Sequence, residues 1–226
     1  MRQILLSCSL LTFLEDPEFI EAGLSADPDT TSLALPYQDA IAEWGPLFAN
    51  QRASRREVTR ANAVVAVRNQ QLDRLSMRFA AAVRATDPSL LEKLFCGKAP
   101  GKFVRQPLRQ QCEKTRDVMV PEIIKLGANH PLAAYAPQLL TSLNAALAAL
   151  EARTKARGAR TVVAHEERAW KEGINTKRAL TYGELLKIAA TNKYPKDWAD
   201  TFFPQKNTTA DDEQETTDTP EKTDGT

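Results

Sequence analysis

Two histidines and three cysteines are the residues best suited to metal binding or nucleophilic chemistry. Zinc needs Cys and His at short spacings, whereas His130, His165, Cys8, Cys96 and Cys112 are scattered. A ferritin-like di-iron site needs Glu-x-x-His on two helices, and neither histidine has a glutamate three residues before it. We therefore predict no metal, no cofactor and no enzymatic activity, with a cryptic Ser-His-Asp or Cys-His site as an alternative. Three scattered cysteines are also typical of a reducing compartment.

Basic side chains form two clusters. They are Arg52, Arg55, Arg56 and Arg60, and Arg153, Lys155, Arg157 and Arg160. In an antiparallel helix pair the two clusters would approach each other and could neutralise phosphates. However, residues 1–204 carry a net charge of only +6, Glu57 and Glu151 intervene, and no aromatic residues are interleaved for stacking. The sequence thus favours solvated helix flanks, with nucleic-acid binding as the alternative.

Three aromatic residues, Trp198, Phe202 and Phe203, occur within six residues and precede Pro204. One interpretation is a short amphipathic turn that closes one end of a helical bundle. The other is an exposed motif that docks onto a protein partner.

Two long helical stretches must position these residues. Residues 132–193 are rich in Ala, Leu, Lys, Arg and Glu and contain one proline, Pro137; as one helix they would be about 90 Å long. A second helix is expected over residues 36–86, kinked or restarted at Gly45-Pro46.

The second helix contains a heptad pattern. Its members are Val58, Ala61, Val65, Arg68, Leu72, Leu75, Phe79 and Ala82. Steps of three and four residues predict a coiled-coil seam through which the protein could self-associate. Arg68 is the polar exception, and we expect its charged end to reach solvent along an aliphatic stem.

The remaining elements are shorter. Residues 3–25 predict one broken or two short helices, because Asp16-Pro17 has the form of an N-cap followed by a first-turn proline. Residues 96–102 predict a loop, which lacks the spacing of a phosphate-binding loop. Residues 107–127 predict a third helix that Pro121 should kink or split.

Together these elements predict an all-α fold, an elongated antiparallel helical bundle or coiled coil built on two very long helices and spanning residues 1–204. The third helix should pack on the end of the second helix and on Leu139–Leu150. The N-terminal helices should pack on Trp44, Leu47 and the Trp170–Ile188 stripe.

The two ends of the chain differ in character. Residues 205–226 hold seven acidic residues against two lysines, a net charge of −5, and predict a disordered acidic tail. The apolar run at residues 4–14 is a poor match to an export signal, since only seven residues precede Cys8. No stretch reaches the ~20 apolar residues of a membrane span, so we expect a cytoplasmic protein with no membrane partner.

Two motifs carry a resemblance. They are Arg178-x-x-x-Tyr182-Gly-Glu-Leu-Leu and Trp198-Ala-Asp-x-Phe202-Phe203-Pro204. With the Ala/Arg/Val-rich stretch at residues 64–75, they resemble a set of uncharacterised bacterial long-helix proteins over roughly residues 16–204. The resemblance implies long-helix architecture and carries over no site residue. The leading hypothesis is a non-enzymatic helical scaffold or protein–protein interaction protein, and the alternative is a nucleic-acid-associated protein.

Overall fold

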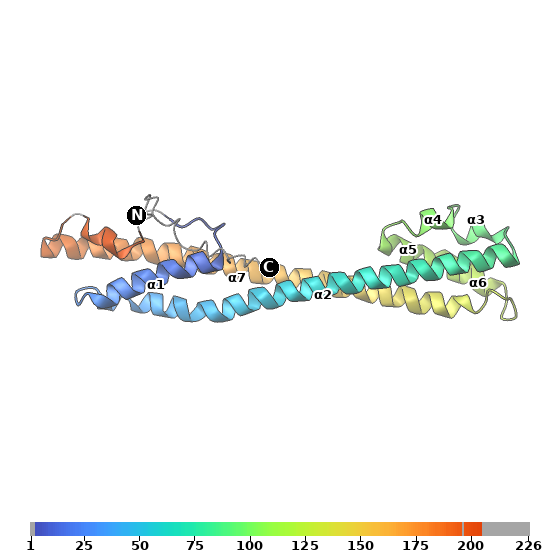
Figure 1. Cartoon of the computed structure of the whole chain (residues 1–226), viewed down its shortest axis with the longest axis horizontal. Helices are drawn as coiled ribbons and strands as arrows, with labels where there is room; N and C mark the ends of the chain where they lie inside the picture. Colours follow the sequence, from blue (N-terminus) through green and yellow to red (C-terminus); the bar gives the residue numbers. More distant parts are fainter. Residues whose placement is uncertain (1–2, 196, 205–226) are drawn as a thin grey trace, which may run out of the picture. The chain divides into compact units, whose positions relative to one another are not determined.

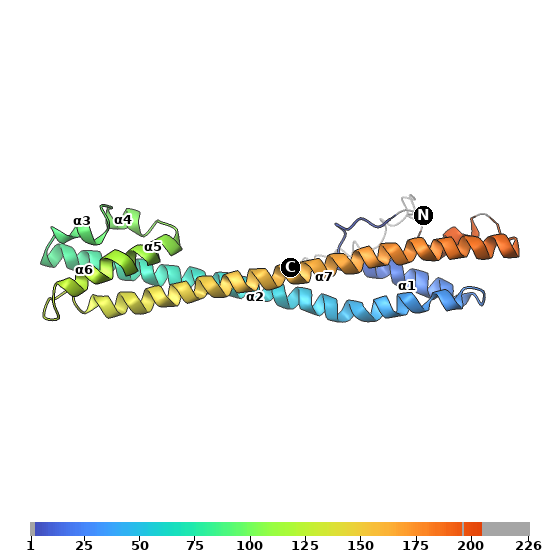
Figure 2. The same cartoon turned by 180° about the vertical axis from the view of Figure 1, so that it is seen from behind.

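The computed structural model describes residues 3–195 and 197–204, and every regular element in those ranges is helical. Two helices are far longer than the rest, α2 (Leu35–Thr86, 52 residues) and α7 (Tyr135–Asn192, 58 residues) (Figures 1 and 2). The shorter helices are α1 (Leu10–Ala26), α3 (Leu90–Leu94), α4 (Pro100–Phe103), α5 (Leu108–Lys114) and α6 (Val120–Lys125). The predicted all-helical class and both long helices are confirmed. The predicted tail lies outside the described residues.

Helix α2 passes through Gly45-Pro46 without interruption. Proline lacks an N–H, so the carbonyl of Ala42 loses its helical partner, but Ala42 is exposed and water can replace that bond. Within α2 the seam residues Val65, Leu72, Leu75 and Phe79 are buried. Arg68 is exposed, as expected, and its Nη1 donates to Oε1 of Gln71 at 2.9 Å.

Helix α7 continues through Gly158, Gly173 and Gly183, although each glycine weakens a helix by about 1 kcal/mol relative to alanine. It ends where Lys193 adopts a left-handed φ of 58°. The Tyr194 N–H then donates to the carbonyl of Ala189 at 2.9 Å, the six-to-one bond of a Schellman cap.

The described residues form two compact units: those up to 44 with those from 170 onward (unit 1), and residues 45–169 (unit 2). Both boundaries fall inside the long helices, so α2 and α7 each contribute to both units.

Unit 2 has its main core where α3–α6 pack on α2 and α7. Phe79 is fully buried, with ring centroids 6.1 Å from Phe95 and 5.2 Å from Tyr135, and Phe95 meets Phe103 edge-on at 5.3 Å. Ile123 and Leu143 belong to the same cluster. A second cluster joins Val65 of α2 to Ala149 and Leu150 of α7. The expected packing of the third helix on α2 and the Leu139–Leu150 stripe is thus found.

The third helix is split as Pro121 predicts. One π-helical turn, Thr115–Met119, separates α5 from α6. Because Pro121 has no N–H to donate to residue 117, a shifted hydrogen-bond register there costs less than elsewhere. The predicted loop at residues 96–102 is shorter than expected, since Pro100 starts α4, a position at which a missing N–H is harmless.

The predicted break at Asp16-Pro17 is wrong. Helix α1 is continuous from Leu10 to Ala26, and its N-cap is Ser9, whose Oγ accepts a bond from the Thr12 N–H at 3.1 Å. Burial of α1 side chains such as Phe13 and Ile20 offsets the one hydrogen bond that Pro17 removes. Asp16 does not cap the helix and is itself buried.

A polar stripe on α7 holds unit 1 together. Arg178, 5% exposed, places Nε 2.7 Å from Oδ2 of Asp16, and Thr181 accepts from the Tyr37 hydroxyl at 3.1 Å. Asn175 bonds both the N–H and the C=O of Ile4, at 3.0 and 2.9 Å. Lys171 donates to the carbonyls of Leu6 and Cys8.

The N-terminal residues 4–8 therefore lie along α7 in a non-helical conformation, held through their backbone. Ile4, Leu6 and Cys8 turn toward Phe13 and Ile174, while the alternate side chains are exposed. In the described part of the chain, no helix combines the length and the apolar composition needed to cross a membrane.

Candidate functional site

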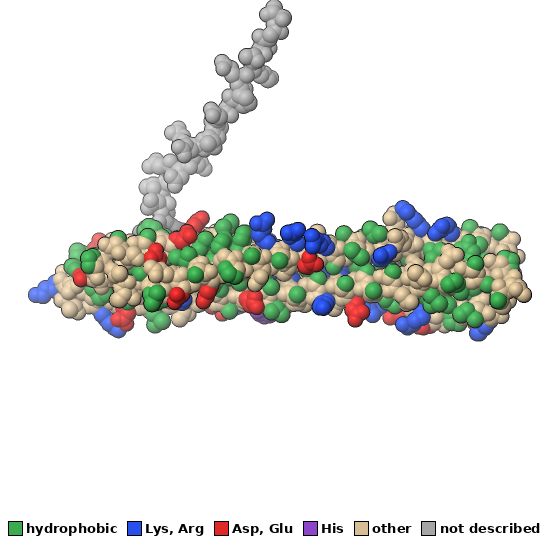
Figure 3. Space-filling model, turned by 90° about the horizontal axis from the view of Figure 1, so that it is seen from below, with side chains coloured by type: hydrophobic (Ala, Val, Ile, Leu, Met, Phe, Trp, Pro, Cys, Tyr) green, Lys and Arg blue, Asp and Glu red, His purple; other side chains and the backbone are tan. Residues whose placement is uncertain are grey.

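Both predicted basic clusters lie in unit 2. The α2 cluster, Arg52, Arg55, Arg56 and Arg60, is exposed throughout. In the α7 cluster Lys155 and Arg157 are exposed, whereas Arg153 and Arg160 are half-buried. Figure 3 shows lysine and arginine side chains gathered over the middle parts of these two helices.

Contacts on either side of the clusters bring them together. Val65 of α2 packs with Leu150 of α7, and Gln51 Nε2 donates to Oε2 of Glu167 at 2.8 Å. Residues 52–60 fall between the two α2 contacts, and residues 153–160 fall between the two α7 contacts. The clusters therefore lie beside each other.

Most of these charges have no internal counter-charge. Arg60 pairs with Glu57 at 2.9 Å and Arg160 with Glu167 at 2.7 Å. Five others have neither a carboxylate within 4.0 Å nor a ring contact among the described residues: Arg55, Arg56, Arg153, Lys155 and Arg157. Arg52 lies over the Phe48 ring, 6.0 Å from its centroid. The positive charges of these five side chains are thus available to an external anion.

The two units carry net charges of opposite sign. Residues 45–169 contain 21 lysines and arginines against 10 aspartates and glutamates, a net charge of +11. Residues 1–44 and 170–204 contain 7 against 12, a net charge of −5. The value of +6 for residues 1–204 averages a strongly basic unit with an acidic one, so it understates the field around the clusters.

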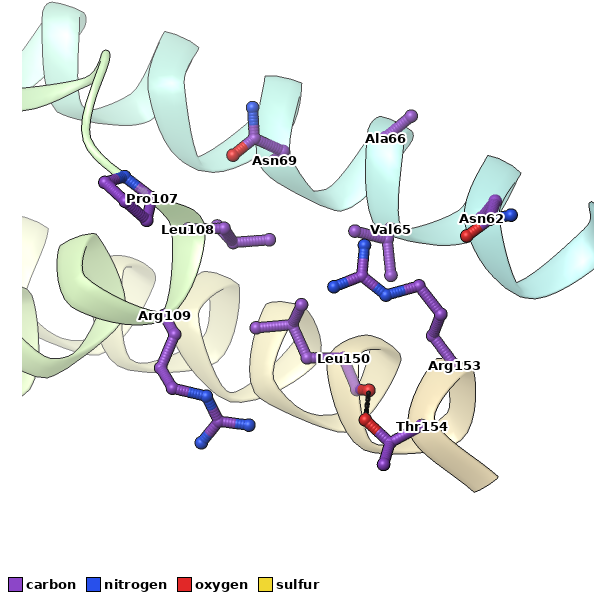
Figure 4. Close-up of a pocket in the computed structure, with 10 residues that line it drawn as sticks. All are labelled: Asn62, Val65, Ala66, Asn69, Pro107, Leu108, Arg109, Leu150, Arg153 and Thr154. Carbon is purple, nitrogen blue, oxygen red and sulfur yellow. Dashed lines mark hydrogen bonds between the residues drawn. The ribbon is translucent and has the colours of Figure 1, made fainter. Parts of the chain in front are cut away.

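A groove of about 630 Å³ opens beside the clusters, between α2, α5 and α7. Its lining residues are Asn62, Val65, Ala66, Asn69, Pro107, Leu108, Arg109, Leu150, Arg153 and Thr154. In Figure 4 the Arg153 side chain extends over the groove toward Val65, whereas the Arg109 guanidinium points away. The groove thus combines an apolar floor with one guanidinium.

Hydrogen bonds to the carboxylate of Asp73 hold Asn69, which lines this groove, in place. Asn69 Nδ2 donates to Oδ2 of Asp73 at 3.1 Å, and Gln111 Nε2 donates to Oδ1 of Asp73 at 3.0 Å. Burial raises the pKa of Asp73 and the Gln111 bond opposes this. Because a carboxylate accepts only from the NH₂ of a carboxamide, Asn69 keeps its Oδ1 free as an acceptor.

The aromatic residues 198–203 lie in unit 1. Phe202 and Phe203 are 6% and 4% exposed, in a cluster with Ile20, Leu24 and Tyr37. Trp198 is half-buried, and its ring lies 5.0 Å from that of Phe202. In this conformation only part of Trp198 is available to a partner, so these residues close the core of unit 1.

The titratable residues considered for catalysis are dispersed. His165 is exposed, and Nδ1 of His130 accepts from the Leu132 N–H at 3.2 Å. Burial raises the pKa of the Cys112 thiol to about 11, and all three cysteines are free. Within residues 3–195 and 197–204, no group of three or more His, Cys, Asp or Glu side chains could hold a metal ion.

Sequence reasoning missed Asn62, Asn69 and Arg109, because the groove draws on three helices and no local motif marks it. Comparison of the chain with protein-family models, curated proteins and solved structures gives no match. The resemblance to bacterial long-helix proteins therefore stays a prediction.

Proposed function

We propose that the chain is a non-enzymatic helical scaffold in which α2 and α7 run antiparallel through unit 2. Two contacts support this direction. Gln51 meets Glu167 and Val65 meets Leu150, so α2 numbers rise as α7 numbers fall. Such a pair would hold the two basic clusters on one stiff support.

The partner that we propose is nucleic acid, bound through unit 2. The observation that carries this proposal is the pair of adjacent basic clusters with five side chains that lack a carboxylate partner. Residues 52–60 rise about 12 Å along a helix, and duplex DNA carries one phosphate charge per about 1.7 Å of its axis. Each cluster can therefore meet several phosphates.

Fluorescence anisotropy with a labelled oligonucleotide tests this. Five contacts predict a slope of roughly −4 to −5 in a plot of log K against log salt for duplex DNA. Reversing Arg55, Arg56 and Arg157 to Glu should reduce the affinity at least tenfold and flatten the slope by about 3. Arg160 is left intact, because it pairs with Glu167.

Three other arginines of α2 provide a matched control. Arg74, Arg78 and Arg84 are exposed, belong to unit 2 and lie outside the clusters. Their reversal to Glu changes the net charge equally and should cost much less affinity. Equal losses in both triple variants, or no binding by the wild type at about 50 mM salt, would contradict the proposal.

A second candidate is self-association, favoured by the opposite charges of the two units. Four of the eight predicted seam residues, Val65, Leu72, Leu75 and Phe79, are buried inside the chain, so we propose that association uses charge: the acidic unit of one copy would meet the basic unit of another. Light scattering should then give a mass above 25.0 kDa at about 50 mM salt and the monomer mass at about 500 mM. A monomer mass at both salt concentrations contradicts this candidate.

A further inference from the structure

The groove of unit 2 has a floor suited to a flat apolar group. Val65 and Leu150 are buried to 8% and 7% exposure, and the half-buried Leu108 of α5 adjoins them. The volume of about 630 Å³ is within the range of small-ligand sites. The floor is aliphatic, so it would bind a ring by burying its face.

Arg153 supplies the anion-binding group of the groove. Its side chain is half-buried, it extends over the floor (Figure 4), and no carboxylate among the described residues lies within 4.0 Å. Arg157 follows one turn later on α7 and is exposed, so the two guanidiniums lie on the same side of the helix. A chain of phosphates could follow them out of the groove.

The two carboxamides supply hydrogen bonds for the edge of a ring. Asn69 presents Oδ1 as an acceptor, because Asp73 already takes its NH₂ group. Asn62 is exposed, lines the same groove and can donate or accept. A nucleobase edge needs such donors and acceptors.

We propose that this groove binds one unpaired nucleotide of a single-stranded nucleic acid, which deepens the proposed function and rests on it. The base lies on the floor formed by Val65, Leu108 and Leu150. Its edge bonds to Asn69 and Asn62, and its phosphate contacts Arg153. A duplex cannot use the groove, because its bases are paired and stacked. Unit 2 therefore binds single strands more tightly than duplex of the same sequence.

The test is fluorescence anisotropy with a labelled strand of ~12 nucleotides and its duplex, using the full chain at about 50 mM salt. Arg153→Gln is compared with Arg55→Gln, since each removes one charge that lacks a carboxylate partner. Arg55→Gln should weaken single strand and duplex by the same factor. Arg153→Gln should weaken single strand about five- to tenfold more than duplex, and Asn62→Ala should weaken single strand alone.

Each other outcome overturns a defined part of the reasoning. Equal binding of both forms by the wild type, or equal effects of Arg153→Gln and Arg55→Gln on both forms, contradicts the groove and leaves the phosphate contacts in place. No binding of either form contradicts the proposed function itself. Thermal melting of each variant by circular dichroism checks that it is folded, and all three altered side chains reach the surface.

Discussion

Replacing Arg178 with Met should destabilise unit 1 by an amount that depends strongly on pH. The Arg178 guanidinium lies 2.7 Å from Oδ2 of Asp16, and both side chains are buried. Methionine keeps most of the aliphatic volume of Arg178, loses the guanidinium whose Cζ lies 5.6 Å from the Phe203 ring centroid, and leaves the carboxylate of Asp16 without its cation. A buried unpaired carboxylate takes up a proton instead of staying charged.

The loss of stability in Arg178→Met follows from leaving the Asp16 carboxyl buried without its cation. Burial raises the pKa of Asp16 from its ordinary value of 3.8, and the Arg178 charge works against this rise. Without Arg178 nothing opposes the rise that burial causes in the pKa of Asp16, so the charged carboxylate becomes still less favourable in the folded protein. Disruption of buried pairs typically costs about 3–5 kcal/mol, so about 3–4 kcal/mol is expected at pH 7.

The sign of the pH dependence is fixed by the direction of the shift. Because the folded-state pKa of Asp16 is raised, its contribution to stability is fully present below 3.8 and is lost as the pH rises through the folded-state pKa. Arg178→Met raises that pKa further. The penalty of Arg178→Met should therefore shrink from about 3–4 kcal/mol at pH 7 to about 1 kcal/mol or less at pH 4.

Urea unfolding followed by circular dichroism at the two pH values measures the penalty. Asp16→Asn/Arg178→Met removes the ionisable group and should recover most of the loss at pH 7. Lys187→Met is the matched control, because the Lys187–Glu184 pair is exposed and is worth less than about 1 kcal/mol. A penalty of equal size at pH 4 and pH 7, or a double variant no more stable than Arg178→Met, would refute the reasoning.

Three further predictions concern other parts of the chain. Phe79→Ala should cost about 3–5 kcal/mol in urea unfolding, because Phe79 is fully buried among aromatic rings; Met77→Ala, at a position 40% exposed, should cost below about 1 kcal/mol, and similar costs would contradict the assigned core. Asn175→Ala should remove hydrogen-exchange protection from the Ile4 amide, which donates to Asn175, while protection of α1 stays; unchanged protection at Ile4 would show that this bond does not hold the segment. Cys112 should resist iodoacetamide at neutral pH in the folded protein, because its pKa of about 11 leaves almost no thiolate; labelling as fast as in urea would refute its burial.

The long helices could be predicted from sequence because their signal is repeated over many residues. Ala, Leu and charged residues favour a helix at nearly every position of α7, and the α2 seam adds a periodic apolar face. One unfavourable residue, such as Pro46 or Gly158, cannot outweigh that sum. The capping of α7 was less visible, since Lys193 in a left-handed conformation replaces the usual glycine.

The wrong or missed predictions share one physical origin: each depends on contacts between residues that are distant in sequence. Asp16 before Pro17 has the form of a helix N-cap, but the residue that determines its role, Arg178, lies on α7. The charge of the candidate site was averaged over residues 1–204, because no change of composition marks unit boundaries that fall inside two continuous helices. The basic clusters were found because each is local, whereas the groove beside them is not.

The division of the chain also sets an order of events during synthesis. Unit 2 is one uninterrupted segment, residues 45–169, so it can fold as soon as that segment has left the ribosome. Unit 1 joins the first 44 residues to those after 169, through contacts such as Trp170 Nε1 to the Ala40 carbonyl at 3.1 Å. The N-terminal segment is therefore made first and completed last, and until α7 emerges its apolar side chains, Phe13 and Ile20 among them, have no α7 to pack against.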